Sequence, residues 1–562
     1  GFDIMKDRSK GDLWLLSTDG RKIHHKLTSR EANESNAQWS PTGDRIAFVS
    51  SSEEGSEIYL YWTETGTVAK LTQLENSPSN LEWSPDGTQI AFSMKVNAKP
   101  PVLAKMPEKP KGAKWAESPR ITDRLKHEAD GAGYLKPGFS HIFVIPAEGG
   151  SPRQLTSSSF NHGGSLSWSK NGQKIYFSGN RNTDWEYDFR NSEVYSIDIY
   201  TKLFEQLTTV SGPDYAPKVS PDGKKIAYLG YEDKVQAYQV TKLYVMDVNG
   251  DTKKVISAKF DRDVDTAEWA PDGKGFYIQY NDLGRTKIGY MDLDGNVSEL
   301  VDNLGGTTLG RPYASGSFSI SSNGKIAYTI SYPERPADVA LLDKPNTKPR
   351  LLTMLNEDLL AFKTMATLEE INYKSSIDGR NLQGWLMYPP HYDKTKKYPL
   401  IVENHGGPIL NYGPFFSAEM QLYASAGYFV FYPNPRGSTS YGEEFGNLLY
   451  NNYPGEDYND VMDGVDEVLK SGKIDQDRLF VTGGSAGGIM TAWIIGKNNR
   501  FRAAVVAKPV MNWISKTLVA DNYYGYANSR YPGQPWENFE NYWKFSPISL
   551  VGNVETPTMV MV

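Results

Sequence analysis

The chain has 562 residues, and 60 Lys and Arg stand against 67 Asp and Glu, which gives a formal charge of −7. This acidic balance argues against binding to nucleic acid or anionic membranes through bulk charge. With 23% charged and 39% hydrophobic residues the composition is that of a globular protein, and no apolar run reaches the roughly 18 residues of a membrane helix. Cysteine is absent, which excludes disulfides, thiolate catalysis and cysteine-ligated metals.

A short turn motif recurs through the first two-thirds of the chain. Its copies are spaced about 50 residues apart, with one interval of about 85. Regular spacing of this kind is typical of a repeat architecture. In its fullest form it reads Trp-Ser-Pro-Asp-Gly, in which Pro presets the first corner of the turn and Gly takes the left-handed position. The six copies begin at Trp39, Trp83, Trp168, Val219, Trp269 and Ile320.

A β-rich run follows each turn, as in Arg45-Ile-Ala-Phe-Val49, and several repeats end in a Leu-Thr phrase, as at Leu71-Thr72. Short strands in groups of four at this period predict an all-β propeller over residues 1–355. Six turns predict six blades, and residues 12–28 are interpreted as the second half of a further one. The sequence therefore predicts a seven-bladed β-propeller whose first blade is incomplete.

The longer interval contains an insertion over about residues 95–139, rich in Lys and Pro. It is interpreted either as a solvated loop or as a flap at the mouth of the propeller.

From about residue 365 the pattern changes to alternating strands and helices, after a linker around 362–370. We expect strands at 383–388, 398–404, 428–433, 478–482, 501–507 and 556–562, with helices at 417–426, 456–470 and 486–496. This alternation predicts a mostly parallel, doubly wound sheet over residues 365–562.

Ser485 is the candidate nucleophile of this second domain. The apolar run Arg478–Thr482 leads into Gly483-Gly-Ser-Ala-Gly-Gly488, and a helical stretch follows. A strand, Gly-x-Ser-x-Gly and a helix in succession form the turn that exposes the serine in α/β-hydrolases. The alternative is an ordinary glycine-rich turn.

The second catalytic element is His405-Gly406-Gly407-Pro408 after the strand at 398–404. In α/β-hydrolases such a loop donates one backbone N–H to the oxyanion hole, and the residue after the serine donates another. We assign the oxyanion-hole donors to Gly407, with Gly406 beside it, and to Ala486. His405 precedes the serine, whereas the triad order is Ser, Asp, His. We therefore expect His405 to orient the loop rather than to act as general base.

These motifs, in order, resemble the prolyl oligopeptidase family of serine peptidases. The resemblance covers the propeller, His-Gly-Gly-Pro, Asn434-Pro-Arg-Gly-Ser438 with Tyr441-Gly442, the Ser485 motif, Ser546-Pro-Ile and Thr556-Pro-Thr. It is strongest to the acylaminoacyl-peptidase and dipeptidyl-aminopeptidase branch. The resemblance implies that the propeller caps the site and admits only short peptides.

The family places its catalytic Asp and His after the Thr-Pro strand, so the resemblance implies that both follow Val562. The only Asp after Ser485 is Asp521, which comes too early, and no His follows His405. The expectation is a chain truncated at both ends and, taken alone, inactive and poorly soluble.

Further site residues are assigned through the resemblance. Arg436 is expected to hold the oxyanion loop through a salt bridge, with substrate contact as the alternative. Trp513, Tyr523 and Tyr524 follow the strand after the nucleophile helix, where family members build a substrate pocket. Aromatic residues are as often part of the core, and both interpretations stay open.

The predicted function is a serine peptidase that cleaves short peptides near the N-terminus, of acylaminoacyl- or dipeptidyl-peptidase type. Carboxypeptidase-like or esterase activity on the same scaffold, or a non-catalytic propeller interaction protein, are the alternatives. We predict no metal or other cofactor, no nucleic-acid or membrane partner, and leave a homo-oligomer open. Periplasm and cytoplasm both fit, and a signal peptide before Gly1 would favour the periplasm.

Overall fold

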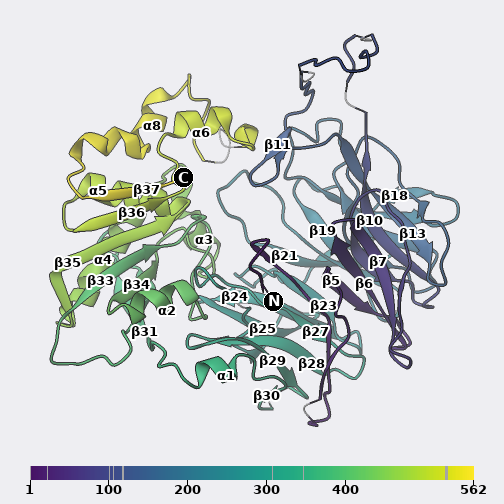
Figure 1. The fold of residues 1–562 in the computed structure, drawn as a ribbon, viewed down its shortest axis with the longest axis horizontal. Coiled ribbons are helices and arrows are strands. Elements are labelled where there is room, and N and C mark those ends of the chain that lie inside the picture. Colours follow the sequence, from purple (N-terminus) through teal and green to yellow (C-terminus); the bar gives the residue numbers. More distant parts are fainter. Residues whose placement is uncertain are drawn as a thin grey trace. The chain divides into compact units, whose positions relative to one another are not determined.

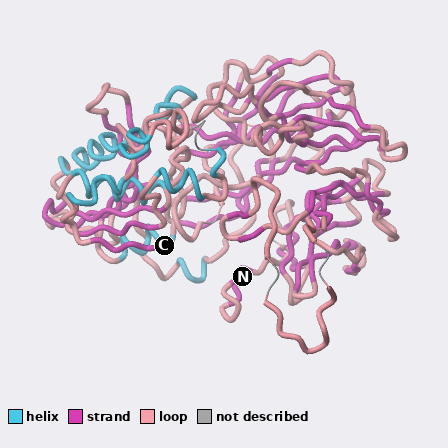
Figure 2. Tube along the Cα trace, turned by 90° about the horizontal axis from the view of Figure 1, so that it is seen from above, coloured by secondary structure: helices cyan, strands magenta, loops and turns pink. Residues whose placement is uncertain are grey.

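The computed structural model describes residues 2–21, 23–99, 101–104, 107–116, 119–306, 308–345, 347–525 and 530–562. Their contacts divide the chain into two compact units. The first comprises Gly1–Leu16, Ile23–Glu232 and Tyr244–Lys254, and the second comprises Ser17–Lys22, Asp233–Leu243 and Val255–Val562. Strands dominate up to residue 351, and every described helix lies beyond residue 356 (Figure 1, Figure 2).

Six four-stranded sheets follow one another in a propeller-like succession. Their strands are β5 (Asn33–Trp39), β6 (Arg45–Ser52), β7 (Gly55–Trp62) and β8 (Val68–Lys70); β9 (Pro78–Trp83), β10 (Gln89–Asn97), β13 (Gly138–Pro146) and β14 (Arg153–Gln154); β15 (Gly163–Trp168), β16 (Lys174–Gly179), β17 (Glu193–Asp198) and β18 (Phe204–Gln206); β19 (Asp214–Val219), β20 (Lys225–Gly230), β21 (Lys242–Asp247) and β22 (Lys254–Val255); β23 (Thr266–Trp269), β24 (Gly275–Asp282), β25 (Arg285–Asp292) and β26 (Val297–Val301); β27 (Phe318–Ile320), β28 (Ile326–Tyr332), β29 (Arg335–Leu342) and β30 (Arg350–Leu351).

The six predicted turns each join the first two strands of one sheet, which confirms the repeat. The glycine of every turn has a positive φ, from 67° at Gly273 to 80° at Gly324, as the motif requires. The prediction of seven blades was wrong, because the described residues form six. Residues 12–28 form only β3 (Trp14–Leu16) and β4 (His24–Lys26), two three-residue strands that pair with each other and build no four-stranded sheet.

The threonine of the recurring Leu-Thr phrase hydrogen-bonds through its hydroxyl to a strand earlier in the chain. Thr208 Oγ1 accepts the N–H of Val194 at 2.8 Å and donates to the carboxylate of Glu193 at 2.5 Å. The same backbone bond recurs at 2.8 to 3.0 Å from Leu13 to Thr28, Ile58 to Thr72, Ile142 to Thr156, Leu243 to Ser257 and Val339 to Thr353. Each hydroxyl accepts a buried or half-buried backbone N–H that would otherwise lack a partner within its strand pair.

The insertion departs from the second sheet between β10 and β13. It contains a separate hairpin of β11 (Glu128–Ala129) and β12 (Gly133–Tyr134). A further short pair near the start of the chain is β1 (Phe2–Asp3) with β2 (Arg8–Ser9).

The final part of the chain forms one seven-stranded sheet in the order β31-β32-β34-β33-β35-β36-β37. Strands β33 to β37 run parallel, and β31 and β32 add an antiparallel edge. The strands are β31 (Leu368–Lys374), β32 (Asn381–Met387), β33 (Tyr398–Asn404), β34 (Phe429–Asn434), β35 (Ile474–Gly484), β36 (Ala503–Ala507) and β37 (Thr558–Met561). The mostly parallel sheet is as predicted, but β31 was not expected.

The described helices lie in the same part of the chain as this sheet. They are α1 (Glu357–Leu360), α2 (Ala418–Ser425), α3 (Glu443–Gly446), α4 (Asp457–Lys470), α5 (Ala486–Lys497), α6 (Trp513–Val519) and α8 (Phe539–Lys544), with 3₁₀ turns η1 (Asn447–Leu449), η2 (Tyr523–Gly525) and η3 (Pro547–Asn553). None of the described helices is long and apolar enough to cross a membrane.

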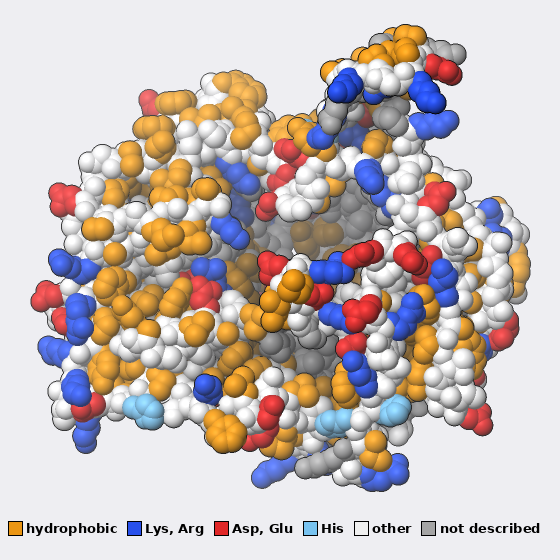
Figure 3. All heavy atoms as spheres, in the orientation of Figure 1, with side chains coloured by type: hydrophobic (Ala, Val, Ile, Leu, Met, Phe, Trp, Pro, Cys, Tyr) orange, Lys and Arg blue, Asp and Glu red, His pale blue; other side chains and the backbone are white. Residues whose placement is uncertain are grey.

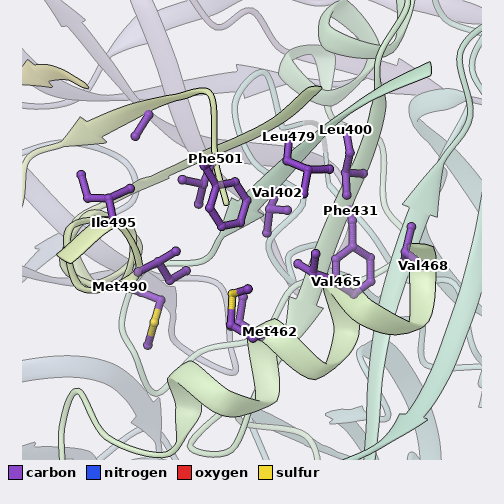
Figure 4. Packing of buried hydrophobic residues seen from close by; sticks show 14 of the residues in the cluster. Leu400, Val402, Phe431, Met462, Val465, Val468, Leu479, Met490, Ile495 and Phe501 are labelled. Atoms are coloured by element: carbon purple, nitrogen blue, oxygen red, sulfur yellow. The ribbon is translucent and has the colours of Figure 1, made fainter. Parts of the chain in front are cut away.

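The core of this domain lies between α4, α5 and the strands. Met462, Val465 and Val468 lie one helical turn apart along α4 and point toward Val402 and Phe431 of the sheet (Figure 4). All five side chains are at most 8% exposed. This packing holds α4 against β33 and β34, and the candidate site follows the end of β33. On the face shown in Figure 3, acidic and basic side chains are interspersed.

Candidate active site

Ser485 occupies a sharp turn between the end of β35 at Gly484 and the start of α5 at Ala486. Its φ of 57° and ψ of −119° are unusual for a residue with a side chain. The backbone is held there by the bond from Ser485 N–H to the Ala507 carbonyl, 3.0 Å. Ser485 is exposed, while Ala486 behind it is buried. The serine hydroxyl is therefore presented at the end of the sheet, as the motif predicts.

The glycines around Ser485 are required by close backbone contacts. A Cβ on Gly487 would lie 2.0 Å from the Asn404 carbonyl oxygen, and one on Gly488 would lie 2.4 Å from that of Ala507. A Cβ on Gly483 would lie 2.5 Å from the Gly487 oxygen. The first turn of α5 is thus pressed against the ends of β33 and β36. No other residue type fits at these positions without moving the turn.

The loop after β33 lies beside Ser485. A Cβ placed on Gly406 would be 3.6 Å from the Ser485 Cβ and 3.2 Å from the Gly484 oxygen. Gly407 is exposed, with a φ of 116° that favours glycine. Ala486 is the first residue of α5, so its N–H has no partner within the helix. Gly407 follows Gly406, which lies beside Ser485, and Ala486 follows Ser485 directly, so both predicted oxyanion donors stay candidates for that role.

His405 is buried at the start of this loop, and both of its ring nitrogens are engaged there. Nδ1 donates to the Gly406 carbonyl at 2.8 Å, and Nε2 lies 2.9 Å from the Ser438 hydroxyl, which also donates to the Pro435 carbonyl at 2.6 Å. Burial lowers the pKa of His405 to about 4, so the ring is neutral. These contacts give His405 an orienting position and leave no nitrogen for Ser485.

Arg436 is 2% exposed, and its guanidinium is surrounded by acceptors. Nε and Nη2 donate to the two oxygens of Asp460 on α4 at 2.8 and 2.9 Å, and Nη1 donates to Glu456 at 2.6 Å. The turn that carries Arg436 also carries Ser438, which contacts His405. The shortest salt bridges of Arg436 thus go to α4 and the residue before it, and its expected role of holding the oxyanion loop stays a prediction.

The three candidate pocket residues differ in how far the structure buries and describes them. Trp513 is 3% exposed and packs against the rings of Tyr453 and Tyr531, with centroids 6.0 and 5.3 Å away. It belongs to the same buried cluster as Ala486. Tyr523 is half-buried in η2. The side chain of Tyr524 lies outside the described part of the structure.

Three groups around the site were not expected from the sequence. Tyr453 donates from its hydroxyl to the Ala486 carbonyl at 3.1 Å and so braces the start of α5. Glu403 is fully buried one residue before the end of β33 and pairs with Arg311. Tyr313 accepts the N–H of Gly406 at 2.7 Å. Of these three residues, only Glu403 could have been suspected from the sequence, as an acidic residue near the end of an apolar strand.

Comparison with known proteins places these motifs in a family. The model of the prolyl oligopeptidase family matches residues 414–562, and the model of the dipeptidyl peptidase IV N-terminal region matches residues 111–235. An uncharacterized peptidase of Bacillus subtilis, YuxL, is 31% identical over 99% of this chain and 85% of its own length. Dipeptidyl-peptidase 5 of Porphyromonas gingivalis is 28% identical over 70% of this chain, and the match spans 58% of that protein's length.

Solved structures share the fold. Pyrococcus horikoshii acylaminoacyl peptidase superposes with a TM-score of 0.83 at 23% identity over 100% of this chain and 82% of that one. An acylaminoacyl peptidase in complex with Z-Gly-Gly-Phe-chloromethyl ketone gives a TM-score of 0.80 at 24% identity, over 96% of this chain and 79% of the other. With the extent of the Bacillus match and the strand–serine–helix turn, the chain belongs to the prolyl oligopeptidase family of peptidases.

Proposed function

We propose that the protein is a serine exopeptidase that cleaves short peptides near their N-terminus, with Ser485 as nucleophile. The observation that carries the proposal is the geometry of Ser485: an exposed serine on a strained turn that opens a twelve-residue helix, with Gly406 of the predicted oxyanion loop beside it. The names of the relatives, dipeptidyl-peptidase 5 and acylaminoacyl peptidase, support a substrate cleaved close to its N-terminus.

The chemistry is acyl transfer. Ser485 Oγ attacks the carbonyl carbon of the scissile bond while a histidine base removes its proton. The oxygen of that carbonyl becomes negative and is stabilised by the N–H groups of Gly407 and Ala486, the latter helped by the positive end of α5. The C–N bond then breaks, the base returns the proton to the leaving amine, and water hydrolyses the acyl-enzyme.

The general base of this step is a histidine other than His405. Nδ1 of His405 contacts the loop and Nε2 contacts Ser438 on the turn that carries Arg436, and a pKa of about 4 makes the ring a poor proton acceptor near neutral pH. In this proposal His405 and Arg436 orient the oxyanion loop, and the predicted boundary at 355–365 separates the blades from the domain that performs the chemistry.

A substrate panel tests the proposal in the natural full-length protein. Dipeptidyl p-nitroanilides with a free amine, N-acetyl-aminoacyl p-nitroanilides and short p-nitrophenyl esters are compared, with Ser485→Ala as the blank. We expect hydrolysis of at least one anilide class and at least about a thousandfold loss in Ser485→Ala. Hydrolysis of esters alone would identify an esterase, and release of a C-terminal residue from unmodified peptides would identify a carboxypeptidase; either result overturns the proposal.

A further inference from the structure

A segment outside the catalytic sheet reaches the oxyanion loop. Residues 308–313 lie between β26 and β27, in the same compact unit as the serine. We call residues 308–313 the bracing segment. The Pro312 carbonyl accepts the N–H of Gly413 at 3.0 Å, and Tyr313 forms a backbone bridge with Tyr412. The Ser417 hydroxyl donates to the Gly310 carbonyl. Backbone contacts thus fix the bracing segment to the residues that follow the oxyanion loop.

Tyr313 acts on the oxyanion loop directly. Its hydroxyl oxygen accepts the N–H of Gly406 at 2.7 Å, and its ring contacts that of Tyr412 with centroids 4.9 Å apart. Burial raises the pKa of Tyr313, which keeps the phenol neutral at working pH. The Gly406 amide is buried, so without this acceptor it would be left without compensation for its lost hydration.

The two peptide units on either side of Gly406 are held by different side chains. Tyr313 holds the N–H of the unit between His405 and Gly406, and His405 Nδ1 holds the carbonyl of the unit between Gly406 and Gly407. In a planar trans peptide the C=O and N–H point in opposite directions. The contact of His405 with the Gly406 carbonyl therefore sets the direction of the Gly407 N–H, the candidate oxyanion donor, and the contact of Tyr313 fixes the peptide unit before it.

Arg311 contacts the backbone at Gly484, just before Ser485. Its guanidinium pairs with buried Glu403, and Tyr412 donates to the same carboxylate at 3.2 Å. A Cβ on Gly484 would lie 3.1 to 3.4 Å from three guanidinium atoms of Arg311, so the planar group rests against the backbone just before Ser485. The bracing segment thus touches the residue before the nucleophile as well as the residue before the oxyanion donor.

We propose that Tyr313 and Arg311 are positioning residues that preorganise the oxyanion hole. Tyr313 fixes the peptide unit that precedes the one carrying the Gly407 N–H, and Arg311 supports the Ser485 turn. This inference rests on the proposed function of Ser485 and Gly407. Preorganised donors cost nothing to orient during the reaction, and a glycine-rich loop has little rigidity of its own. A displacement of the donor by a fraction of an ångström weakens the bond to the oxyanion more than any bond to the ground-state carbonyl.

Tyr313→Phe in the natural full-length protein tests the proposal. It keeps the ring packing and removes the oxygen that holds Gly406. With a chromogenic anilide we expect kcat to fall about tenfold while KM stays within about twofold, because only the transition state uses the oriented donor. The inhibition constant of a peptidyl trifluoromethyl ketone, whose oxyanion occupies the same hole, should rise by the factor by which kcat/KM falls. The affinity of a product-like peptide should not change.

Tyr432→Phe is the matched control. Tyr432 belongs to the same buried cluster as Tyr412, and its hydroxyl has no hydrogen-bond partner within the described residues. Its loss should leave kcat and the ketone affinity within about twofold of the wild type. A kcat of Tyr313→Phe within twofold of wild type, an equal loss in Tyr432→Phe, or a change confined to KM would each overturn the role of Tyr313.

Arg311→Lys tests the second contact while keeping a positive charge near Glu403. A lysine cannot lie flat against Gly484, so we expect a roughly three- to tenfold loss of kcat. Arg285→Lys, in an exposed 3.8 Å pair with Glu370, is the control that should change nothing. Equal activity of Arg311→Lys and wild type would overturn the role of Arg311. Wild-type protein that a fluorophosphonate does not label at Ser485 would instead refute the proposed function, so the two failures are distinguishable.

Discussion

At the scale of single residues, the site depends on backbone atoms that side chains hold in place. The candidate oxyanion donors are both main-chain N–H groups, and His405, Tyr313 and Tyr453 contact the peptide units next to them. Glycine is required where these backbones approach each other. The site should therefore be more sensitive to added bulk than to the loss of most polar groups.

Gly487→Ala tests that sensitivity. The added methyl would lie 2.0 Å from the Asn404 oxygen and 3.0 Å from the His405 oxygen, and neither backbone can move without disturbing the sheet. We expect a loss of at least about 2 kcal/mol in the free energy of unfolding and no measurable peptidase activity. Thermal unfolding and anilide hydrolysis measure both. Gly552→Ala, where a Cβ meets nothing within 4 Å, should behave as wild type; similar behaviour of the two variants would contradict the packing argument.

His405 makes a pH-dependent contribution to stability. Burial lowers its pKa to about 4 in the folded state, from an ordinary value of 6.5. A depressed pKa stabilises the folded state above pH 6.5, and this contribution is lost as the pH falls toward 4. The loss is on the order of 3 kcal/mol. His405→Gln removes it, so the melting temperature of the wild type should fall more steeply than that of the variant between pH 7 and 4. Parallel curves for the two proteins would show that His405 does not titrate in this way.

At the scale of elements, much of the fold was predictable because its signals are local. Each blade turn is encoded in about five residues, and the alternation around Ser485 is encoded in about twenty. The strand β31 was missed because Glu369, Glu370 and Lys374 give it the pattern of an exposed segment, as befits an edge strand. The seventh blade was predicted from residues that form only two short strands.

The bracing segment could not be found from the sequence. Tyr313 and Gly406 are 93 positions apart, and Arg311 and Glu403 are 92 apart, with no motif that links them. The serine and the glycines were found because a reactive turn needs particular residue types in a row. Side chains such as those of Tyr313 and Arg311 need only be long enough to contact the site, and the tertiary structure decides whether they lie close to it.

The hydroxyl of the Leu-Thr phrase can be tested at Thr208. Thr208→Val keeps the shape but leaves the Val194 N–H and the Glu193 carboxyl without their shared partner. We expect a loss of about 1–3 kcal/mol, read as a lower melting temperature. Thr208→Ser retains the hydroxyl, as Ser257 does in the following blade, and should lose clearly less. A larger effect of Ser than of Val would assign the role to the methyl group instead.

At the scale of the whole molecule, the residues that build the site come from widely separated parts of the sequence but from one compact unit. The bracing segment, the oxyanion loop, the Arg436 turn and the Ser485 turn all lie within Val255–Val562. That unit holds the last two blades together with the seven-stranded sheet. The boundary at 355–365, drawn from the change in sequence pattern, stays a prediction.

The central claim is that Ser485 is the nucleophile. The most direct measurement is covalent labelling of the natural full-length protein with a fluorophosphonate, followed by mass spectrometry of the peptides. We expect one label per chain on the peptide that contains Gly483–Gly488, parallel loss of peptidase activity, and no label in Ser485→Ala. A label on another residue, or full activity in protein that carries the label at Ser485, would contradict the account.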